Sequence, residues 1–222
     1  MKREIITTGD GSKTIHIPEW NEQYHSKHGA INEAKHVFIE HGLNAKLLAS
    51  EAQAIGILEI GFGTGLNAFL TALEAEKLGI HINYVGVEAF PVLKDELSLL
   101  NYVAEIAPTQ KTIFENIHDT SWETKHKITS NFDLTKRKQR FENINDKEKF
   151  DLIYFDAFGA RVQPELWTKA IFNLMYDALL PSGMLVTYAA IGQVRRDMTK
   201  IGFSVERLNG PPGKRHMLRA TK

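Results

Sequence analysis

The feature that most constrains the fold of this chain is a run of alternating glycines after a short apolar segment. Residues 55–60 are predicted to form a buried strand, Gly61, Gly63 and Gly65 follow it, and an apolar helix is predicted over residues 66–78. Glycine lacks a Cβ, so this turn can adopt left-handed backbone angles and let a ligand approach the main chain, while the helix offers unpaired N–H groups. The pattern indicates a nucleotide-binding turn, although such turns also serve only to pack a strand against a helix.

The spacing of the glycines narrows the kind of ligand. Glu59 precedes them, and the pattern is G-x-G-x-G, not the G-x-G-x-x-G of dinucleotide-binding enzymes. An acidic residue at the strand end repels a pyrophosphate and suits a cationic ligand. S-adenosylmethionine carries an ammonium, a sulfonium and no phosphate, so the loop favours this cofactor over NAD or ATP.

Two further acidic residues follow predicted strands. Glu88 comes after residues 81–87, and Asp156 comes after the nearly all-apolar residues 150–155, with Phe158 close behind. Open α/β sheets bind ligands at the carboxyl ends of their strands, so Glu88 is predicted to accept hydrogen bonds from ribose hydroxyls. A carboxylate at the mouth of a buried strand is costly to desolvate, which favours a functional role for Asp156. The alternative for both is a strand-end acid with a purely structural role.

The amino-acid composition limits the classes of protein to which this chain can belong. The chain has 222 residues, of which 43% are hydrophobic, which suffices for one substantial core. It has no cysteine, which excludes disulfides, thiolate metal sites and cysteine nucleophiles and favours a cytoplasmic location. No apolar run is long enough to span a bilayer. Lys and Arg (27) balance Asp and Glu (27), so a nucleic-acid partner needs a local basic patch.

The first fifty residues are predicted to form an arm in front of the main domain. Residues 4–17 alternate around Gly9-Asp-Gly11, which indicates a hairpin, and a helix with apolar spacing follows from about residue 34 to residue 42 or beyond. We therefore divide the chain into an arm, residues 1–50, and a domain, residues 51–222. The histidines of the arm are interpreted as pocket or surface residues, and no metal site is predicted, because no metal-binding motif accompanies them. They are His25, His28, His36 and His41.

The rest of the chain alternates between strand and helix patterns. A helix over residues 92–102 is predicted to bury Leu93, Leu97 and Leu100, and residues 132–141 form a strand with a dense positive run. That run is either a solvated edge or a phosphate contact. A helix starts at Pro164, buries Leu166, Ile171, Leu174, Met175 and Leu179, and ends before residues 181–183. A strand (184–188), a helix (192–201) and a closing pair of strands (203–208 and 215–220) complete the chain.

This order predicts an α/β fold of the Rossmann-like kind, because alternating strands and helices build a parallel doubly wound sheet. We expect a mostly parallel seven-stranded sheet with a C-terminal antiparallel strand, as in class I methyltransferases, plus the small N-terminal arm.

The motifs together resemble a known family. Glu59-Ile-Gly61-Phe-Gly63-Thr-Gly65, Glu88-Ala-Phe-Pro91 and Phe155-Asp-Ala-Phe158 are similar to those of S-adenosylmethionine-dependent methyltransferases. With Pro164-Glu-Leu-Trp167, Val194-Arg-Arg196 and Gly213-Lys-Arg-His-Met217, they resemble the methyltransferase domain of MnmC, a bifunctional bacterial tRNA-modifying enzyme. The resemblance runs from about residue 24 to residue 219.

The resemblance implies a substrate and a reaction. A methyl group passes from S-adenosylmethionine to the amine of 5-aminomethyl-(2-thio)uridine at the tRNA wobble position. The flavin-dependent oxidase domain of MnmC has no counterpart in these 222 residues, so we expect no FAD and no metal, and another enzyme would supply the aminomethyl group.

The resemblance also implies roles for single residues. Asp156 would take a proton from the amine and position its nitrogen, and Phe158 would wall the site. The residues implied in cofactor binding are Glu59, Gly61, Phe62, Gly63, Thr64, Gly65, Asn67 and Glu88, with Tyr24, His25 and Ser26 closing over the methionine end. Those proposed to bind tRNA are Arg195, Arg196, Lys214 and Arg215. The adenine contact is left open, with residues 139–142 in that region.

Two other functions stay open at this point. A small-molecule amine N-methyl- or aminopropyltransferase would share the sheet, the glycines and the acids but would not need the basic loops. A non-enzymatic module that binds the cofactor and RNA would show no methyl release, and Asp156 argues against it. A dehydrogenase is excluded by the glycine spacing.

Overall fold

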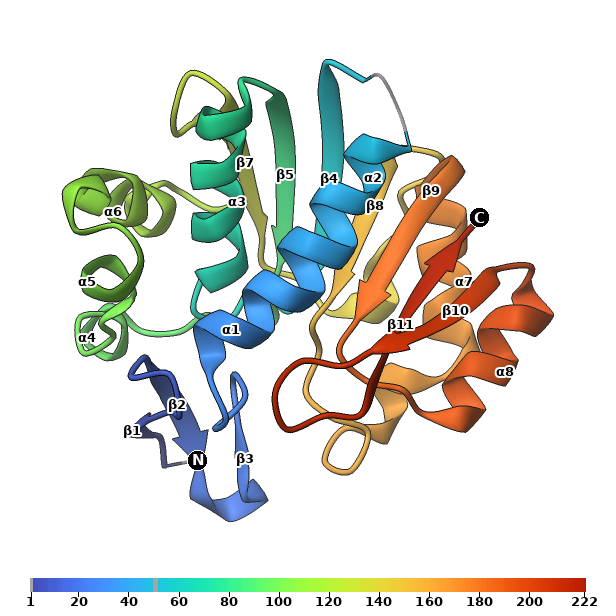
Figure 1. Cartoon of the computed structure of the whole chain (residues 1–222), viewed down its shortest axis with the longest axis horizontal. Helices are drawn as coiled ribbons and strands as arrows, with labels where there is room; N and C mark the ends of the chain where they lie inside the picture. Colours follow the sequence, from blue (N-terminus) through green and yellow to red (C-terminus); the bar gives the residue numbers. More distant parts are fainter. Residues whose placement is uncertain (1, 50–51) are drawn as a thin grey trace.

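An eight-stranded sheet lies between two layers of helices in the computed structural model, which describes residues 2–49 and 52–222 (Figure 1). β9, β8, β4, β5 and β7 are parallel, and β10, β11 and β6 run antiparallel to their neighbours. In spatial order the strands are β10 (Ser204–Asn209), β11 (His216–Thr221), β9 (Leu179–Thr187), β8 (Phe150–Phe155), β4 (Ala54–Ile60), β5 (His81–Val87), β7 (Phe132–Arg137) and β6 (Lys125–Lys127). The mostly parallel α/β fold is confirmed, with β6 as one strand more than the seven expected.

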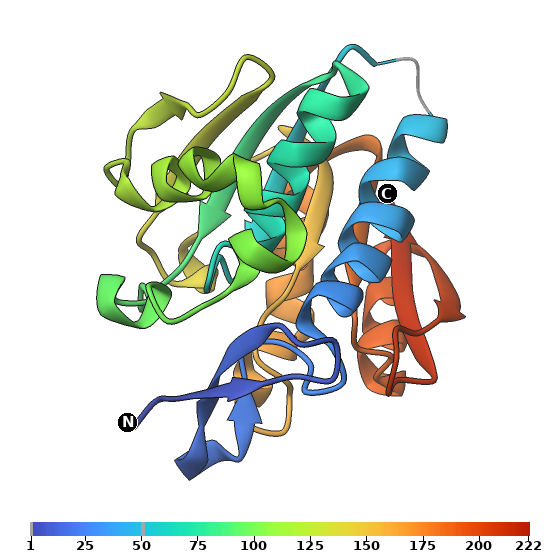
Figure 2. The same ribbon diagram turned by 60° about the vertical axis from the view of Figure 1, so that its left-hand side comes forward.

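Helices cover both faces of the sheet, which explains why its central strands are apolar almost throughout (Figure 2). One face carries α1 (Ala30–Ala34), η2 (Lys35–Asn44), α2 (Ala45–Leu48), α3 (Leu66–Leu78), α5 (Tyr102–Ile106), η3 (Pro108–Gln110) and α6 (Lys111–Asp119). The other carries η4 (Phe141–Asn143), η5 (Pro164–Trp167), α7 (Lys169–Ala178) and α8 (Gly192–Ile201). The helix at residues 192–201 and the closing strand pair are confirmed.

The strands of the N-terminal arm lie below the carboxyl ends of the parallel strands in Figure 1. They are β1 (Glu4–Thr7), β2 (Lys13–Ile17) and, after η1 (Pro18–Trp20), β3 (Glu22–Gln23), so the predicted hairpin is confirmed. The helical part of the arm, α1, η2 and α2, packs against the sheet. Asn101 fastens the hairpin to the domain, since its side chain accepts from Lys13 N at 2.7 Å and donates to Gly11 O at 3.0 Å. The proposed boundary between arm and domain falls on residues 50 and 51, outside the described residues.

The helix predicted over residues 92–102 is wrong. Only one turn, α4 (Lys94–Leu97), forms there, and Leu93 is 65% exposed instead of buried. Leu93 has an extended backbone, and the Glu96 carboxylate accepts its N–H at 3.0 Å and pairs with Arg3 at 2.8 Å. The contact between Leu93 and Glu96 caps the start of α4, and the pairing of Glu96 with Arg3 ties this turn to the N-terminal segment.

The other departures are smaller. The helix predicted from Pro164 is split, because Thr168 is extended between η5 and α7, and Leu179 belongs to β9. Ile171 and Met175 are buried as predicted. The strand at 132–141 ends at Arg137 and is not an edge strand, since β6 covers it.

Candidate active site

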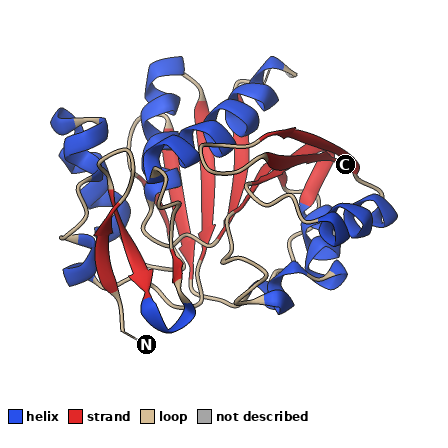
Figure 3. Cartoon of the chain, turned by 60° about the horizontal axis from the view of Figure 1, so that its bottom comes forward, coloured by secondary structure: helices blue, strands red, loops and turns tan. Residues whose placement is uncertain are grey.

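The carboxyl ends of the parallel strands and residues of the arm line one cavity of about 700 Å³. Figure 3 turns the side of the molecule on which the strands of the arm lie toward the viewer. The strand order places β8, β4 and β5 side by side, so the acids and glycines that follow them meet at one edge of the sheet. Nine of the predicted site residues line this cavity. They are Tyr24, His25, Ser26, Gly61, Gly63, Glu88, Asp156, Phe158 and Lys214.

The glycine turn has the backbone that its sequence predicts. Gly61, Gly63 and Gly65 have φ angles of 89°, 49° and 72°, in the left-handed region. A Cβ on Gly61 would lie 2.6 Å from the carbonyl oxygen of Asp156, and a Cβ on Gly63 would lie 3.2 Å from the Tyr24 ring. The absence of side chains therefore lets the turn pass between the end of β8 and the arm.

Glu88 joins this turn to the end of β5. Its carboxylate accepts Gly63 N at 3.1 Å through one oxygen and Phe90 N at 2.9 Å through the other. Each oxygen retains a lone pair, so the group can also accept from hydroxyls of a ligand in the cavity.

Asn67 connects two carboxylates behind the glycine turn. Its side-chain nitrogen donates to Glu59 and to Asp156, at 2.9 Å in each case. Glu59 is 1% exposed and does not line the cavity, and its second oxygen has no partner among the described residues. Burial raises the pKa of Glu59 well above its usual range, against the lowering effect of the hydrogen bond from Asn67. In the structure Glu59 accepts a hydrogen bond from Asn67. Its predicted contact with the ammonium of the cofactor stays a prediction.

Asp156 has the chemistry of a base at neutral pH. Burial, and then repulsion by the nearby Glu33 carboxylate, raise its pKa to about 7, against the lowering effects of Asn67 and Lys214. A group with this pKa exchanges protons readily with an amine near pH 7.

Glu33 and Tyr188 line the same cavity and were not predicted. Glu33 accepts Ser26 N at 3.1 Å and pairs with Lys214 Nζ. The Lys214 ammonium also lies 3.9 Å from the centre of the Tyr188 ring, whose hydroxyl donates to Ala157 O at 2.8 Å. Tyr188 follows β9 directly, so the strand-end rule could have found it. Glu33 lies inside a helix and carries no such signal.

The arm closes the cavity with aromatic rings and one buried histidine. Tyr24 and Phe158 meet edge to face with ring centroids 4.9 Å apart. His25 Nε2 lies 2.7 Å from Thr64 Oγ1, and burial lowers the pKa of His25 to about 4, so this histidine is neutral. The Thr64 hydroxyl therefore bonds to the arm.

Phe62, also predicted to bind the cofactor, is buried against Gly86. A Cβ on Gly86 would lie 2.3 Å from the Phe62 ring, so the ring fills the space that this glycine leaves open.

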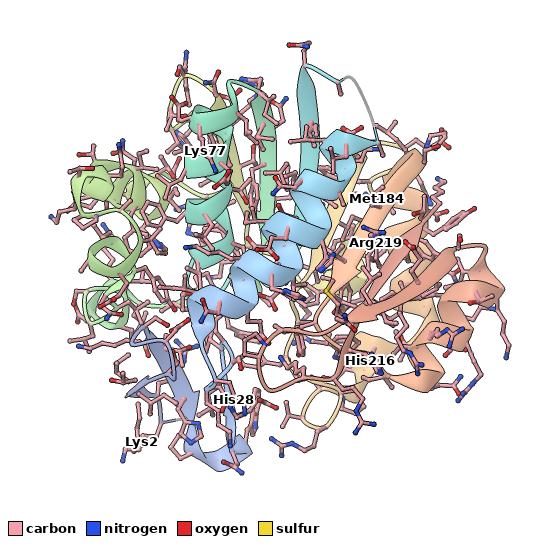
Figure 4. All side chains as sticks on the ribbon, viewed as in Figure 1. Lys2, His28, Lys77, Met184, His216 and Arg219 are labelled. Atoms are coloured by element: carbon pink, nitrogen blue, oxygen red, sulfur yellow. The ribbon has the colours of Figure 1, made fainter. Side chains whose placement is uncertain are left out.

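The residues predicted to bind tRNA are not gathered in one place. Arg195 and Arg196 lie on α8 and line a separate shallow hollow, Arg215 is exposed on the loop between β10 and β11, and Lys214 turns inward to Glu33. Figure 4 shows this loop beside His28 of the arm.

In the positive run that begins in β7, Lys136 and Arg137 bind partners within the protein. Lys136 is buried and donates to His118 O at 2.9 Å, and Arg137 pairs with Asp146 at 2.6 Å. Of this run, Arg140 lines the cavity. Neither the solvated edge nor the phosphate contact therefore describes Lys136 and Arg137.

A parallel sheet with a closing antiparallel hairpin, a glycine turn after β4 and acids after β5 and β8 defines the class I methyltransferases. Residues 101–222 match the family described as S-adenosyl-L-methionine-dependent methyltransferase, and the chain belongs to this family. The protein is an enzyme with S-adenosylmethionine as its methyl donor.

Relatives in sequence point to one branch of this family. The chain is 30% identical to the tRNA 5-methylaminomethyl-2-thiouridine biosynthesis bifunctional protein MnmC of Delftia acidovorans, over 99% of this chain and 35% of that protein. It is 27% identical to the protein of that name from Pseudomonas aeruginosa, over 91% of this chain and 32% of that protein. The chain therefore spans about a third of the length of these curated relatives.

Solved structures share the fold. MnmC2 from Aquifex aeolicus superposes with a TM-score of 0.76 and 24% identity, over 99% of this chain and 70% of that one. Spermidine synthase from Thermotoga maritima superposes with a TM-score of 0.55 and 13% identity, over all of this chain and 72% of that one. Every helix within residues 2–49 and 52–222 is too short or too polar to cross a lipid bilayer.

Proposed function

We propose that this chain transfers a methyl group from S-adenosylmethionine to the amine of 5-aminomethyl-(2-thio)uridine at the wobble position of tRNA. The observation that carries this proposal is Asp156, a carboxylate with a pKa of about 7 that lines the cavity beside the glycine turn. The names of the relatives support the tRNA substrate. This substrate places the enzyme in the cytoplasm.

The cavity fits the cofactor on chemical grounds. Gly61 and Gly63 leave a cradle that a Cβ would fill, and Glu88 offers lone pairs to ribose hydroxyls. Beyond Glu88, the exposed ring of Phe90 and residues 140–142 line the same cavity, so we assign the adenine to this end. Tyr24 lies over Gly63 of the turn and Ser26 lines the same cavity, so we assign the methionine part to the side that the arm covers. The transfer needs neither FAD nor a metal ion, because the sulfonium already activates the methyl group.

The residues around Asp156 perform the steps that the methyl acceptor requires. An alkylammonium has no lone pair, so the amine must lose a proton and be held in line with the methyl group. Asp156 accepts this proton, and Asn67 fixes the carboxylate by its hydrogen bond of 2.9 Å. The rings of Tyr24 and Phe158 form a wall against which a base or sugar can pack.

The direct test is a transfer assay with the purified chain. We expect label from S-adenosylmethionine to appear on tRNA taken from cells that lack the last methylation, in a nucleoside identified as 5-methylaminomethyl-(2-thio)uridine. Equal transfer to a free alkylamine without tRNA would instead favour a small-molecule amine methyltransferase. Cofactor binding without any methyl release would indicate a module that binds cofactor and RNA only.

A further inference from the structure

Two carboxylates, one ammonium and one aromatic face meet in the wall of the cavity. Glu33 comes from α1, Asp156 follows β8, Tyr188 follows β9 and Lys214 comes from the loop between β10 and β11. The Lys214 ammonium pairs with Glu33 and lies 3.9 Å from the Tyr188 ring centre. Proteins bind alkylammonium groups in this way, between a carboxylate and the face of an aromatic ring.

The position of Lys214 indicates which chemical group binds between Glu33 and the Tyr188 ring. Its side chain ends in a primary alkylammonium, which is also the end group of a protonated aminomethyl substituent. Glu33 is 5% exposed, whereas the Lys214 side chain is 31% exposed and belongs to a surface loop next to Gly213. The carboxylate is therefore fixed and buried, while the lysine, on its flexible four-carbon stem, can swing out to solvent.

We propose that Glu33, with the ring of Tyr188, binds the ammonium of the methyl-accepting substrate beside Asp156, and that Lys214 fills this place until the substrate arrives. This inference rests on the proposed function, because it requires an amine as acceptor. Replacing one ammonium by another keeps the charge of the site unchanged. Repulsion between Glu33 and Asp156 also raises the pKa of Asp156 and makes it a better base.

The reaction then balances with the groups at hand. The substrate ammonium gives one proton to the Asp156 carboxylate, and the neutral nitrogen forms a bond to the methyl carbon as the bond from this carbon to sulfur breaks. The products are a protonated N-methylamine and S-adenosylhomocysteine. Glu33 holds the nitrogen through its remaining N–H groups during this step.

The first experiment compares Glu33→Gln with the wild type on tRNA that carries the aminomethyl group. Loss of a charged hydrogen bond predicts a KM for tRNA higher by about tenfold or more, with unchanged affinity for S-adenosylmethionine in calorimetry. Glu40→Gln is the matched control, since Glu40 lies on the same helical segment but its side chain is 61% exposed. A drop in cofactor affinity for Glu33→Gln would assign Glu33 to the ammonium of S-adenosylmethionine and overturn the proposal.

The second experiment asks what Lys214 does. Lys214→Met removes the competing ammonium, so we expect a lower KM for the tRNA and an unchanged salt dependence of binding. A higher KM with a flatter salt dependence would make Lys214 a phosphate contact, as the sequence analysis proposed, and would contradict its role as an occupant of the amine site.

A double variant separates direct substrate binding by Glu33 from an effect that passes only through Lys214. If Glu33 binds the substrate and Lys214 competes for the same place, Glu33→Gln raises KM by at least as large a factor in the Lys214→Met background as in the wild type, because no competing ammonium is weakened there. If the effect disappears in that background, Glu33 acts only through Lys214 and the inference is wrong. Wild-type protein that transfers no methyl to this tRNA contradicts the proposed function, and the inference falls with it. If the wild type is active and Glu33→Gln has the same KM for tRNA as the wild type, the inference is wrong and the proposed function stands.

Discussion

At the scale of single residues, Asp156 decides the rate of the proposed reaction. We expect Asp156→Asn to lower kcat by about two orders of magnitude or more, because the amide accepts no proton but keeps the shape and the hydrogen bond to Asn67. The wild-type rate should rise through an inflection near pH 7 that the variant lacks, since the pKa of Asp156 is about 7. Steady-state kinetics between pH 5 and 9 measures both effects. Near-normal turnover by the variant with unchanged cofactor affinity would rule out the role as base.

The same pKa predicts a change in stability. An acid whose pKa is raised in the folded state holds its proton there, so its contribution to the free energy of unfolding is present at low pH and is lost as the pH rises through about 7. Asp156→Asn removes this loss. The variant should gain up to about 4 kcal/mol over the wild type at pH 8 but little at pH 4, measured by urea unfolding at both pH values. An equal difference at both pH values would contradict the raised pKa.

Gly61 is required for steric reasons and not only for its φ angle. A Cβ on Gly61 would meet the Asp156 carbonyl at 2.6 Å, whereas a Cβ on Gly79 would meet nothing within 4 Å, although both glycines have a positive φ. Gly79→Ala should cost only about 1–2 kcal/mol of stability, the cost of a left-handed alanine. Gly61→Ala should cost more and also weaken S-adenosylmethionine binding at least tenfold, as calorimetry would show. Equal losses in the two variants would mean that the close approach has no functional role.

At the scale of elements, one hydrogen-bonded chain fastens the arm to the glycine turn. His25 lies 2.7 Å from Thr64 Oγ1, and Thr64 donates to the Tyr102 hydroxyl at 3.3 Å. Thr64→Val keeps the shape of the side chain but leaves these two buried groups unpaired, at a cost of about 1–3 kcal/mol. We expect faster hydrogen exchange in β1–β3 and weaker cofactor binding. The exposed Thr109→Val serves as the control, and unchanged exchange in the arm would contradict this coupling.

Elements with strong local patterns could be predicted, and those fixed by distant contacts could not. The apolar strands, the glycine turn and the acids at the ends of β5 and β8 lie where their sequence places them, because burial on both faces leaves little freedom. The helix predicted over residues 92–102 is reduced to the single turn α4, which Glu96 caps and which Glu96 ties to Arg3, a residue far away in the sequence. Propensity alone carries no information about such a partner.

At the scale of the whole molecule, the fold brings together residues from the two ends of the chain. Glu33 and Lys214 form one ion pair at Asp156, although a helix inside the arm segment and the loop of the last hairpin supply them. The sequence predicts Asp156 at the end of its strand and predicts Lys214 as a tRNA contact, because the charge of Lys214 is visible in the sequence and its partner Glu33 is not. The direction in which a charged side chain points depends on the completed topology.

The whole molecule also decides how tRNA is held. With 27 basic and 27 acidic residues the net charge is zero, so attraction to phosphate must come from local clusters. We expect Arg195→Glu, at the hollow on α8, and Arg215→Glu, on the exposed loop, each to weaken tRNA binding and to make the slope of log affinity against log salt shallower by about one. Lys127→Glu is the control. It also reverses one charge, but Lys127 lies on the edge strand β6, opposite Asp133 of β7. Filter binding at several salt concentrations measures the slopes, and equal slopes for all three variants would place the tRNA on another face of the molecule.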